Sequence, residues 1–244
     1  MEQAVYRAAG DSALLVEFAN RITLAENRRV RALKAALEQK SVPGVGEAVP
    51  AYRSLLIRYD PCRISYGKLT ELVDSCLENL SQLVLPPAVV VEIPVCYEGE
   101  YAPDLALIAQ LEGKSEAEIV RIHSAYDHFI YMLGFTPGQP YGVRTQEPFS
   151  FGRRSTPRVR ARAGSVVVQL GQTDILPFDQ PCGWNILGTT PVRMFDSRRA
   201  DPFLLRSGQW FRHVPISPAE FSDIERRVED GSYVCKTAWK EGSE

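Results

Sequence analysis

The sequence has 244 residues and a net charge of −2, and 45% of its residues are hydrophobic. A chain of this length buries roughly 70% of the surface of its unfolded state. We therefore expect an ordered protein with one large domain or two small ones. The near-neutral charge excludes a general attraction to nucleic acid or to an anionic membrane.

Three further features indicate a soluble cytoplasmic protein without a membrane segment. The longest apolar stretch, 84–95, contains prolines and a glutamate and is too short to cross a bilayer. The N-terminus lacks the basic and apolar regions of a signal peptide. The 5 cysteines are widely spaced without a C-x-x-C pair, which suits reduced thiols better than disulfides or a zinc site.

The first part of the chain alternates between strands and helices. Its predicted elements are a strand at 12–18, a helix at 23–40, two strands within 45–61, a helix at 65–80 and a strand at 88–95. Thr23 is placed to cap the first helix, and Pro50 breaks the pair of strands. With the strand at 88–95 as the last element, this order is compatible with a ferredoxin-like α+β domain. We place the domain boundary after residue 87.

Short strands with frequent breaks dominate the second part. Its predicted elements are helices at 103–112 and 115–125, strands at 158–170, 183–195 and 208–216, and a helix at 217–230. Ser115 with Glu118, and Ser217 with Glu220, have the spacing of capping boxes. The strand spacing favours a β-barrel or sandwich domain over residues 88–244.

Several familiar catalytic motifs are missing from the sequence. Residues 112–115 resemble the end of a P-loop, but the glycine that this motif needs five residues before Gly113 is Ile108. No complete dinucleotide fingerprint and no G-x-S-x-G elbow occurs. His123 and His128 are five residues apart rather than the four that place two ligands on one helical face, so we expect no metal site.

Two irregular segments are candidates for binding. The segment 132–144, MLGFTPGQPYGVR, combines glycines and prolines that make a stiff, shaped loop suited to a binding wall. The second segment is 151–162, in which Arg158, Arg160 and Arg162 alternate with Val159 and Ala161. This pattern predicts either a solvated edge strand or an anion site in which guanidinium groups pair with phosphate or carboxylate.

Six segments carry a resemblance to a known family. They are 49–61, 93–105, 122–138, 155–166, 171–177 and 183–196. Together they resemble the KipI/PxpB family, also called allophanate hydrolase subunit 1. The resemblance implies an N-terminal ferredoxin-like α+β domain followed by a cyclophilin-like β-barrel domain. It also implies a partner, which is a second subunit with another cyclophilin-like domain. In this family the two subunits take part together in the ATP-dependent cleavage of the lactam 5-oxoproline. Related domains form the carboxyltransferase part of urea carboxylase.

The sequence departs from the family pattern mainly in loops. Gln139 replaces an aromatic residue, 141–148 replaces a Leu-Gly-Gly segment, and Asp174 and Cys182 replace glycines. These departures fit a preserved fold with an altered substrate or partner.

The matched segments contain the candidate site residues. We expect His123 to be catalytic and Arg158 to bind an anion such as a phosphate of ATP. The candidate substrate-binding residues are Thr136, Pro137, Gly138, Gln172, Thr173 and Trp184. Each of these residues also has a structural interpretation. His123 is then a residue at a helix end, the loop residues stabilise turns, and Trp184 packs in the barrel interior. We expect Cys182 to be an inert thiol.

Three functions are compatible with the sequence. The first is a subunit of an ATP-dependent 5-oxoprolinase that activates a lactam or amide with ATP and is inactive without its partner. The second is a KipI-like inhibitor of a sensor histidine kinase. The third is a small-molecule binding module without chemistry of its own. We favour the first.

Overall fold

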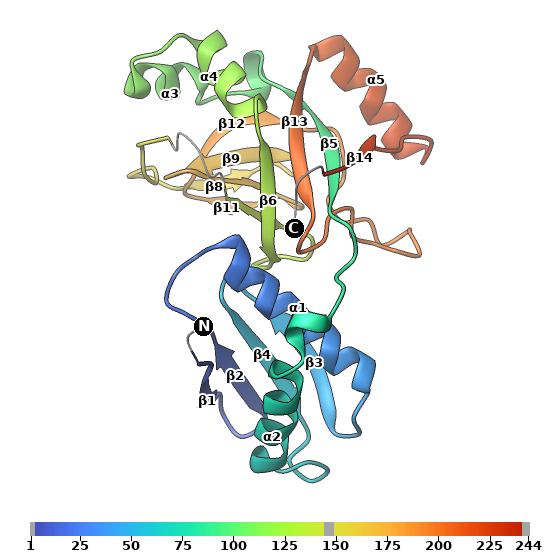
Figure 1. Cartoon of the computed structure of the whole chain (residues 1–244). Coiled ribbons are helices and arrows are strands. Elements are labelled where there is room, and N and C mark those ends of the chain that lie inside the picture. The colour runs from blue at the N-terminus through green and yellow to red at the C-terminus, as the bar shows by residue number, and fades with distance from the viewer. Residues whose placement is uncertain (1–2, 144–148, 241–244) are drawn as a thin grey trace. The chain divides into compact units, whose positions relative to one another are not determined.

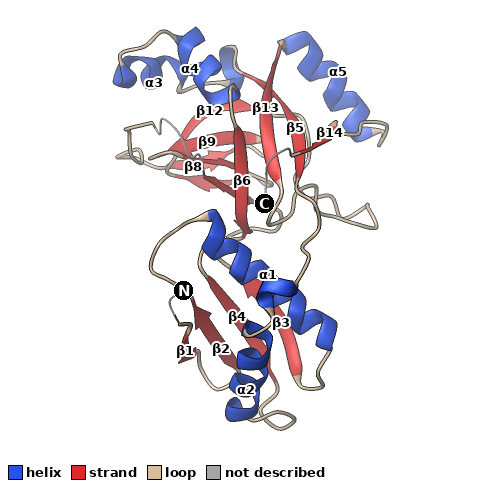
Figure 2. Cartoon of the chain, viewed as in Figure 1, coloured by secondary structure: helices blue, strands red, loops and turns tan. Residues whose placement is uncertain are grey.

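The computed structural model describes residues 3–143 and 149–240. The chain divides into two compact units, Met1–Pro86 and Pro87–Glu244, and each has its own hydrophobic core. Figures 1 and 2 show the elements of both units. None of the helices in the described residues has the length and apolar run needed to cross a membrane.

The first unit is a four-stranded antiparallel sheet with two helices. Its elements are β1 (Val5–Ala8), β2 (Ala13–Glu17), α1 (Leu24–Lys40), β3 (Val45–Pro50), β4 (Ser54–Tyr59), α2 (Tyr66–Leu77) and the 3-10 helix η1 (Leu80–Gln82). The strand order is β1-β2-β4-β3. Thr23 caps α1 as predicted, since its side chain accepts a 3.1 Å hydrogen bond from the backbone N–H of Glu26.

The second unit contains a closed barrel. Its elements are β5 (Val89–Cys96), η2 (Gly99–Tyr101), α3 (Leu105–Glu112), α4 (Glu116–Ser124), β6 (Asp127–Leu133), β7 (Pro140–Val143), β8 (Arg158–Ala161), β9 (Ser165–Gln169), β10 (Gln172–Ile175), β11 (Gln180–Cys182), β12 (Asn185–Thr189), β13 (Trp210–Ile216), α5 (Pro218–Glu229) and β14 (Thr237–Trp239). The sheet runs β12-β9-β10-β7-β6-β13-β5-β14, and a β12–β5 pairing at Thr189 and Cys96 closes the first seven strands into a ring. The α+β class and the barrel are as predicted. Both capping boxes, at the starts of α4 and α5, are confirmed.

The strand predicted at 88–95 does not complete the first sheet. This strand, β5, lies between β13 and β14 in the second unit, and the edge position beside β2 is taken by β1. The position of each of these two strands has a physical reason. β5 is a nearly continuous apolar run, which suits a strand paired along both edges and buried on both faces. β1 reaches β2 through a short local turn that contains Gly10 at φ 68°.

The strands of the barrel differ from the predicted ones in three places. The predicted strand at 158–170 is two strands, β8 and β9, separated by Gly164 at φ 82°. β8 pairs with β11 in a separate two-stranded sheet rather than in the barrel. The predicted strand at 183–195 is ordered as β12 only over Asn185–Thr189. The barrel also uses β6, β7 and β10, three strands that the sequence did not indicate.

Candidate functional site

The three histidines of the chain meet inside the barrel. His123 is in the last turn of α4, His128 is on β6 and His213 is on β13, and each is 1% exposed. The register pairs His128 with Phe211, so His128 and His213 face the same interior side of neighbouring strands. The rings of His123 and His213 are stacked with centroids 4.1 Å apart. The helical spacing rule therefore does not apply to His123 and His128, because only one of them is on a helix.

His123 is held by polar groups on both sides of its ring. The Tyr97 hydroxyl lies 2.8 Å from Nδ1, and the Thr173 hydroxyl lies 3.1 Å from Nε2. Burial raises the pKa of Tyr97 well above its usual range, so its phenol keeps its proton and can either donate to Nδ1 or accept from it. The Thr173 hydroxyl can likewise donate to Nε2 or accept from it, so both tautomers of the ring have two partners. The contacts fix the ring orientation, and a catalytic role for His123 stays a prediction.

His213 differs from its two neighbours in its hydrogen bonding. Within the described part of the chain, neither ring nitrogen of His213 makes a hydrogen bond of normal geometry with another side chain or with the backbone. A contact with the backbone of His123 nevertheless favours the protonated form of the His213 ring and so acts to raise its pKa. Burial, followed by the adjacent His123 and His128, lowers the pKa of His213 well below its usual value. The ring is therefore neutral at neutral pH.

A second set of hydrogen-bonded polar side chains connects the loop between β6 and β7 to β10 and β11. The Thr136 hydroxyl donates to Gln139 Oε1 at 2.8 Å, and Gln139 Nε2 donates to Asp174 Oδ2 at 2.7 Å. Gln180 Nε2 also donates to Gln139 Oε1, at 3.0 Å. Gln139 and Asp174, two separate departures from the family pattern, are thus hydrogen-bonded to each other. Burial raises the pKa of Asp174 to about 8, so this carboxyl is largely protonated at neutral pH.

The backbone of the same loop is constrained. Gly138 adopts φ 83°, and a Cβ there would lie 3.0 Å from the carbonyl oxygen of Met194 and 3.1 Å from Cβ of Phe195. Phe135 is also in the left-handed region, at φ 63°, and is 80% exposed. Pro137 is exposed beside it. The predicted stiff loop is therefore the β6–β7 hairpin connection, held against the segment at 194–195.

Arg158 is bound by a carboxylate of the protein itself. Its Nη2 lies 2.7 Å from Asp104 Oδ1, and Nη1 of Arg154 lies 2.8 Å from the same oxygen. The backbone N–H of Ile186 donates to the other oxygen at 2.7 Å. Two guanidinium groups on one buried carboxylate leave an excess positive charge. Arg158 is thus neither a freely solvated strand residue nor a vacant anion site, and its predicted anion binding stays a prediction.

Trp184 belongs to a small apolar cluster. It packs against Ala161, Val167, Leu176, Cys182 and Ile186. Its backbone N–H donates to Cys182 Sγ at 3.4 Å. Burial raises the pKa of Cys182, which keeps the thiol protonated and unreactive.

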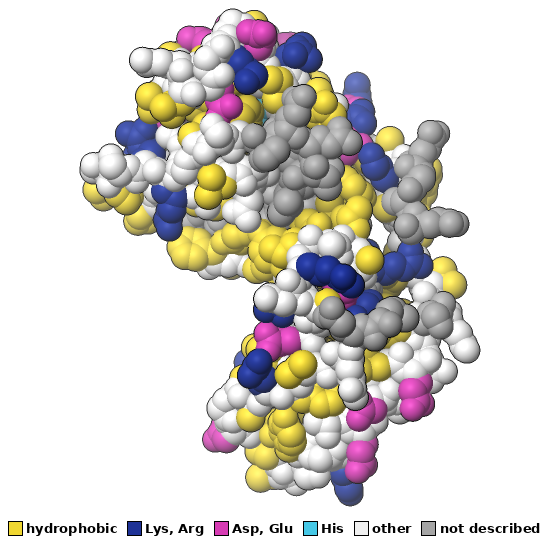
Figure 3. All heavy atoms as spheres, turned by 60° about the vertical axis from the view of Figure 1, so that its left-hand side comes forward, with side chains coloured by type: hydrophobic (Ala, Val, Ile, Leu, Met, Phe, Trp, Pro, Cys, Tyr) yellow, Lys and Arg dark blue, Asp and Glu magenta, His cyan; other side chains and the backbone are white. Residues whose placement is uncertain are grey.

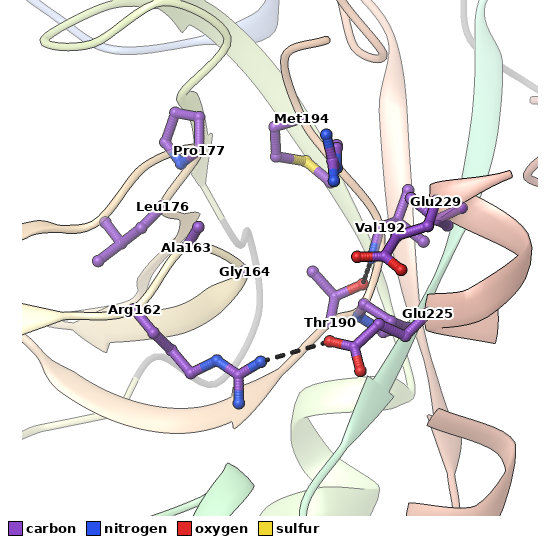
Figure 4. A pocket seen from close by; sticks show the side chains of 13 residues that line it. Arg162, Ala163, Gly164, Leu176, Pro177, Thr190, Val192, Met194, Glu225 and Glu229 are labelled. Atoms are coloured by element: carbon purple, nitrogen blue, oxygen red, sulfur yellow. Dashed lines mark hydrogen bonds and ion pairs between the residues drawn. The ribbon is translucent and has the colours of Figure 1, made fainter. Parts of the chain in front are cut away.

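A small cavity opens between the barrel and α5 (Figure 4). Its volume is about 160 Å³, below the roughly 300–1,000 Å³ of typical ligand pockets. Apolar side chains and charged ones both line it: Leu176, Val192, Met194 and Val228, with Arg162, Arg193, Glu225 and Glu229. Arg162 points toward Glu225, with 3.6 Å between Nη2 and Oε1 (Figure 4). The described lining includes none of the predicted site residues, so this cavity is not the predicted site.

The structure gathers the predicted residues into two groups rather than one. The first holds His123, Thr173 and the adjacent Gln172 on β10, and the Gln139–Asp174 contact connects the same strand to Thr136. The second group contains Trp184 and Arg158. Arg158 on β8 pairs with Cys182 on β11, and Cys182 packs in the apolar cluster that includes Trp184.

Sequence reasoning missed Tyr97, His128, His213 and the Gln139–Asp174 pair. A signal for His213 was present, since it alternates with Phe211 in a predicted strand and so belongs to the buried face.

Comparison with known proteins identifies relatives over both units. Residues 4–205 match the family described as carboxyltransferase domain, subdomain C and D. A 5-oxoprolinase subunit from Bacillus subtilis (strain 168) is 34% identical over 223 residues, which cover 87% of this chain and 92% of that protein.

Two solved structures share the fold. The protein TTHA0988 is 38% identical with a TM-score of 0.74, covering 84% of this chain and 40% of that one. The urea amidolyase of Kluyveromyces lactis matches with a TM-score of 0.78 over 97% of this chain and 16% of that one, at 18% identity, which shows the fold alone. The chain therefore spans less than half the length of these two solved proteins.

Proposed function

The chain belongs to the KipI/PxpB family of 5-oxoprolinase subunits, and we propose that it is one subunit of an ATP-dependent hydrolase that opens a lactam or a related amide. The observation that carries the proposal is the extent of the family match. It runs through both units and includes the β6–β7 loop and β10. Both binding segments predicted from the sequence thus lie within the shared region.

The proposal includes a finer description of the fold and a partner. The first unit is ferredoxin-like and the barrel is cyclophilin-like, and the partner is a second subunit with another cyclophilin-like domain. Two surface features support a partner. Hydrophobic side chains gather on one face of the second unit (Figure 3). Phe135 is held out into solvent by a strained backbone, and such strain concentrates at functional loops.

The proposed roles of the site residues follow from their contacts. Thr136, Gly138 and Thr173 hold the lactam near β10, and Arg158 binds a phosphate of ATP in the complex, where the excess charge beside Asp104 favours an anion. His123 acts through the ordered Tyr97 and Thr173 contacts. Asp174 is a neutral carboxyl that can donate a hydrogen bond. Because it replaces a glycine of the family pattern, we assign the altered substrate preference to the Gln139–Asp174 pair.

Reconstitution tests the proposal. The chain is purified alone and together with a second cyclophilin-like subunit encoded beside it, and release of ADP is measured with 5-oxoproline and with a panel of other lactams and amides. We expect the chain alone to be inactive and the complex to hydrolyse ATP only when one of these compounds is present. A complex that forms but turns over ATP with none of them contradicts the proposal, as does failure of the two chains to associate.

A further inference from the structure

We propose that His123, His128 and His213 together bind one transition-metal ion, with Zn²⁺ as the best fit, inside the barrel. The proposal does not rest on the proposed hydrolase function, although His123 belongs to both sites. It concerns a structural site that joins α4 to β6 and β13, the three elements that supply the ligands.

The geometry brings three ligand atoms within reach of one ion. One nitrogen from each ring lies within 4.8 Å of the others. In a tetrahedral site with Zn–N bonds of about 2.0–2.1 Å, two nitrogens are roughly 3.3 Å apart. Closing the difference requires rotation of the stacked His123 and His213 rings, and His123 then gives up its contact with Thr173. Three imidazoles with a fourth position open is a donor set that zinc uses in proteins.

His213 supplies the independent observation. A buried imidazole without a normal hydrogen bond carries a desolvation cost that no partner offsets. His213 is 1% exposed, and among the described residues both of its ring nitrogens lack such a bond. A metal on one nitrogen removes much of that cost.

The neighbouring contacts orient the other two ligands. Tyr97 contacts Nδ1 of His123, so Nε2 is the nitrogen that binds the ion, in place of its contact with Thr173, and the ring proton then lies on Nδ1 and is donated to the phenol oxygen. His128 Nε2 lies 3.3 Å from the His123 carbonyl oxygen. When it donates there, Nδ1 carries the lone pair for the metal. His123 and His128 thus each have a second contact of the kind that fixes metal-binding histidines.

The donor set also selects the class of ion. The cluster holds imidazoles and, within the described residues, no carboxylate. Ca²⁺ and Mg²⁺ prefer oxygen ligands, so they do not fit. Imidazole nitrogen suits Zn²⁺, Co²⁺, Ni²⁺ and copper, and Zn²⁺ accepts a tetrahedral site without redox chemistry.

Metal titration of the full chain tests the site. The exposed Cys62 is first replaced by Ser to remove a surface thiol that binds metals. Chelator-treated protein is titrated with Zn²⁺ by calorimetry and with Co²⁺ by its visible absorption. We expect one ion per chain, a tetrahedral Co²⁺ spectrum without thiolate bands, and a rise in melting temperature with Zn²⁺. His213→Phe keeps a ring in the core and is expected to weaken Zn²⁺ binding at least tenfold. Asp179→Asn is the matched control, which changes an exposed side chain outside the cluster and keeps all three imidazoles, and it should bind Zn²⁺ as well as the parent.

Two results would overturn the proposal: no stoichiometric Zn²⁺ binding by the parent protein, or undiminished binding by His213→Phe. If His213→Phe does not fold, X-ray absorption at the zinc edge of the parent protein decides instead. Three imidazole ligands support the site, and fewer than three refute it.

Discussion

Replacing Asp174 by Asn tests whether this buried carboxyl carries a proton in the folded protein. Burial raises its pKa from 3.8 to about 8, although hydrogen bonds from Gln139 and from the backbone N–H of Ile175 oppose the shift. The folded protein therefore keeps a proton that the unfolded chain releases once the pH exceeds 3.8.

The sign of the pH dependence follows from this difference. The stability that protonated Asp174 provides is complete below about pH 4 and is lost as the pH rises toward 8, at up to ~1.4 kcal/mol per pH unit. Relaxation around the charged form reduces the loss, so we expect about 1–3 kcal/mol between pH 5 and pH 8. Asp174→Asn cannot ionise and should escape this loss. At pH 5 the variant should be equal or slightly less stable, because a single amide oxygen cannot accept both hydrogen bonds.

The assay can isolate the unit that contains Asp174. All 3 tryptophans, Trp184, Trp210 and Trp239, lie in the second unit. Their fluorescence during urea unfolding therefore reports on that unit. The free energy of unfolding is measured from pH 5 to pH 9 for wild type and Asp174→Asn, and their difference removes the pH dependence of all other groups.

A matched control is available in Asp179. Hydrogen bonds from the backbone N–H of Ala163 and from Arg160 lower its pKa, so it titrates well below the tested range. Asp179→Asn should show a stability difference from wild type that is constant from pH 5 to pH 9. The same constant difference for Asp174→Asn would refute a protonated Asp174.

Three further substitutions test the site. Gly138→Val should cost about 1–2 kcal/mol through its left-handed backbone, plus a steric cost against Met194 and Phe195. The control is Gly152→Val, because a Cβ at Gly152 meets nothing within 4 Å. In urea unfolding this control should change the free energy of unfolding by less than about 0.5 kcal/mol. Equal effects of the two substitutions would argue against the constrained loop. His123→Ala should cost about 2–4 kcal/mol because it opens a buried space and strands the Tyr97 hydroxyl, and a cost near zero in the same assay would contradict that packing. Arg158→Gln should weaken nucleotide binding by the reconstituted complex about tenfold or more, whereas unchanged affinity in calorimetry would leave the ion pair with Asp104 as its role.

Helix ends were predicted well because their chemistry is local. Ser115 with Glu118 and Ser217 with Glu220 form the expected capping boxes, and Thr23 caps α1. Each cap joins atoms three residues apart, so the pattern of side chains alone is sufficient to place it. The alternation of apolar residues in β13 is a signal of the same local kind, but sequence reasoning did not use it and missed His213.

Strand partners could not be predicted in the same way. β5 follows α2 directly, yet it pairs with β13 and β14, more than a hundred residues later. Which strands pair depends on burial on both faces and on closure of the ring, and neither is encoded within a short window of sequence. The strands β1, β6, β7, β10, β11 and β14 escaped prediction for the same reason.

The composition of the candidate site was also decided by tertiary structure. Family resemblance marked His123, Thr173 and the 134–139 loop, but it treated Gln139 and Asp174 as separate departures. Closure of the barrel brings these two side chains to 2.7 Å and buries the carboxyl, which changes its protonation. It also stacks His213 on His123, 90 positions apart in the sequence. Contacts across a barrel arise from the spatial order of its strands, and that order emerges only when the whole sheet has closed.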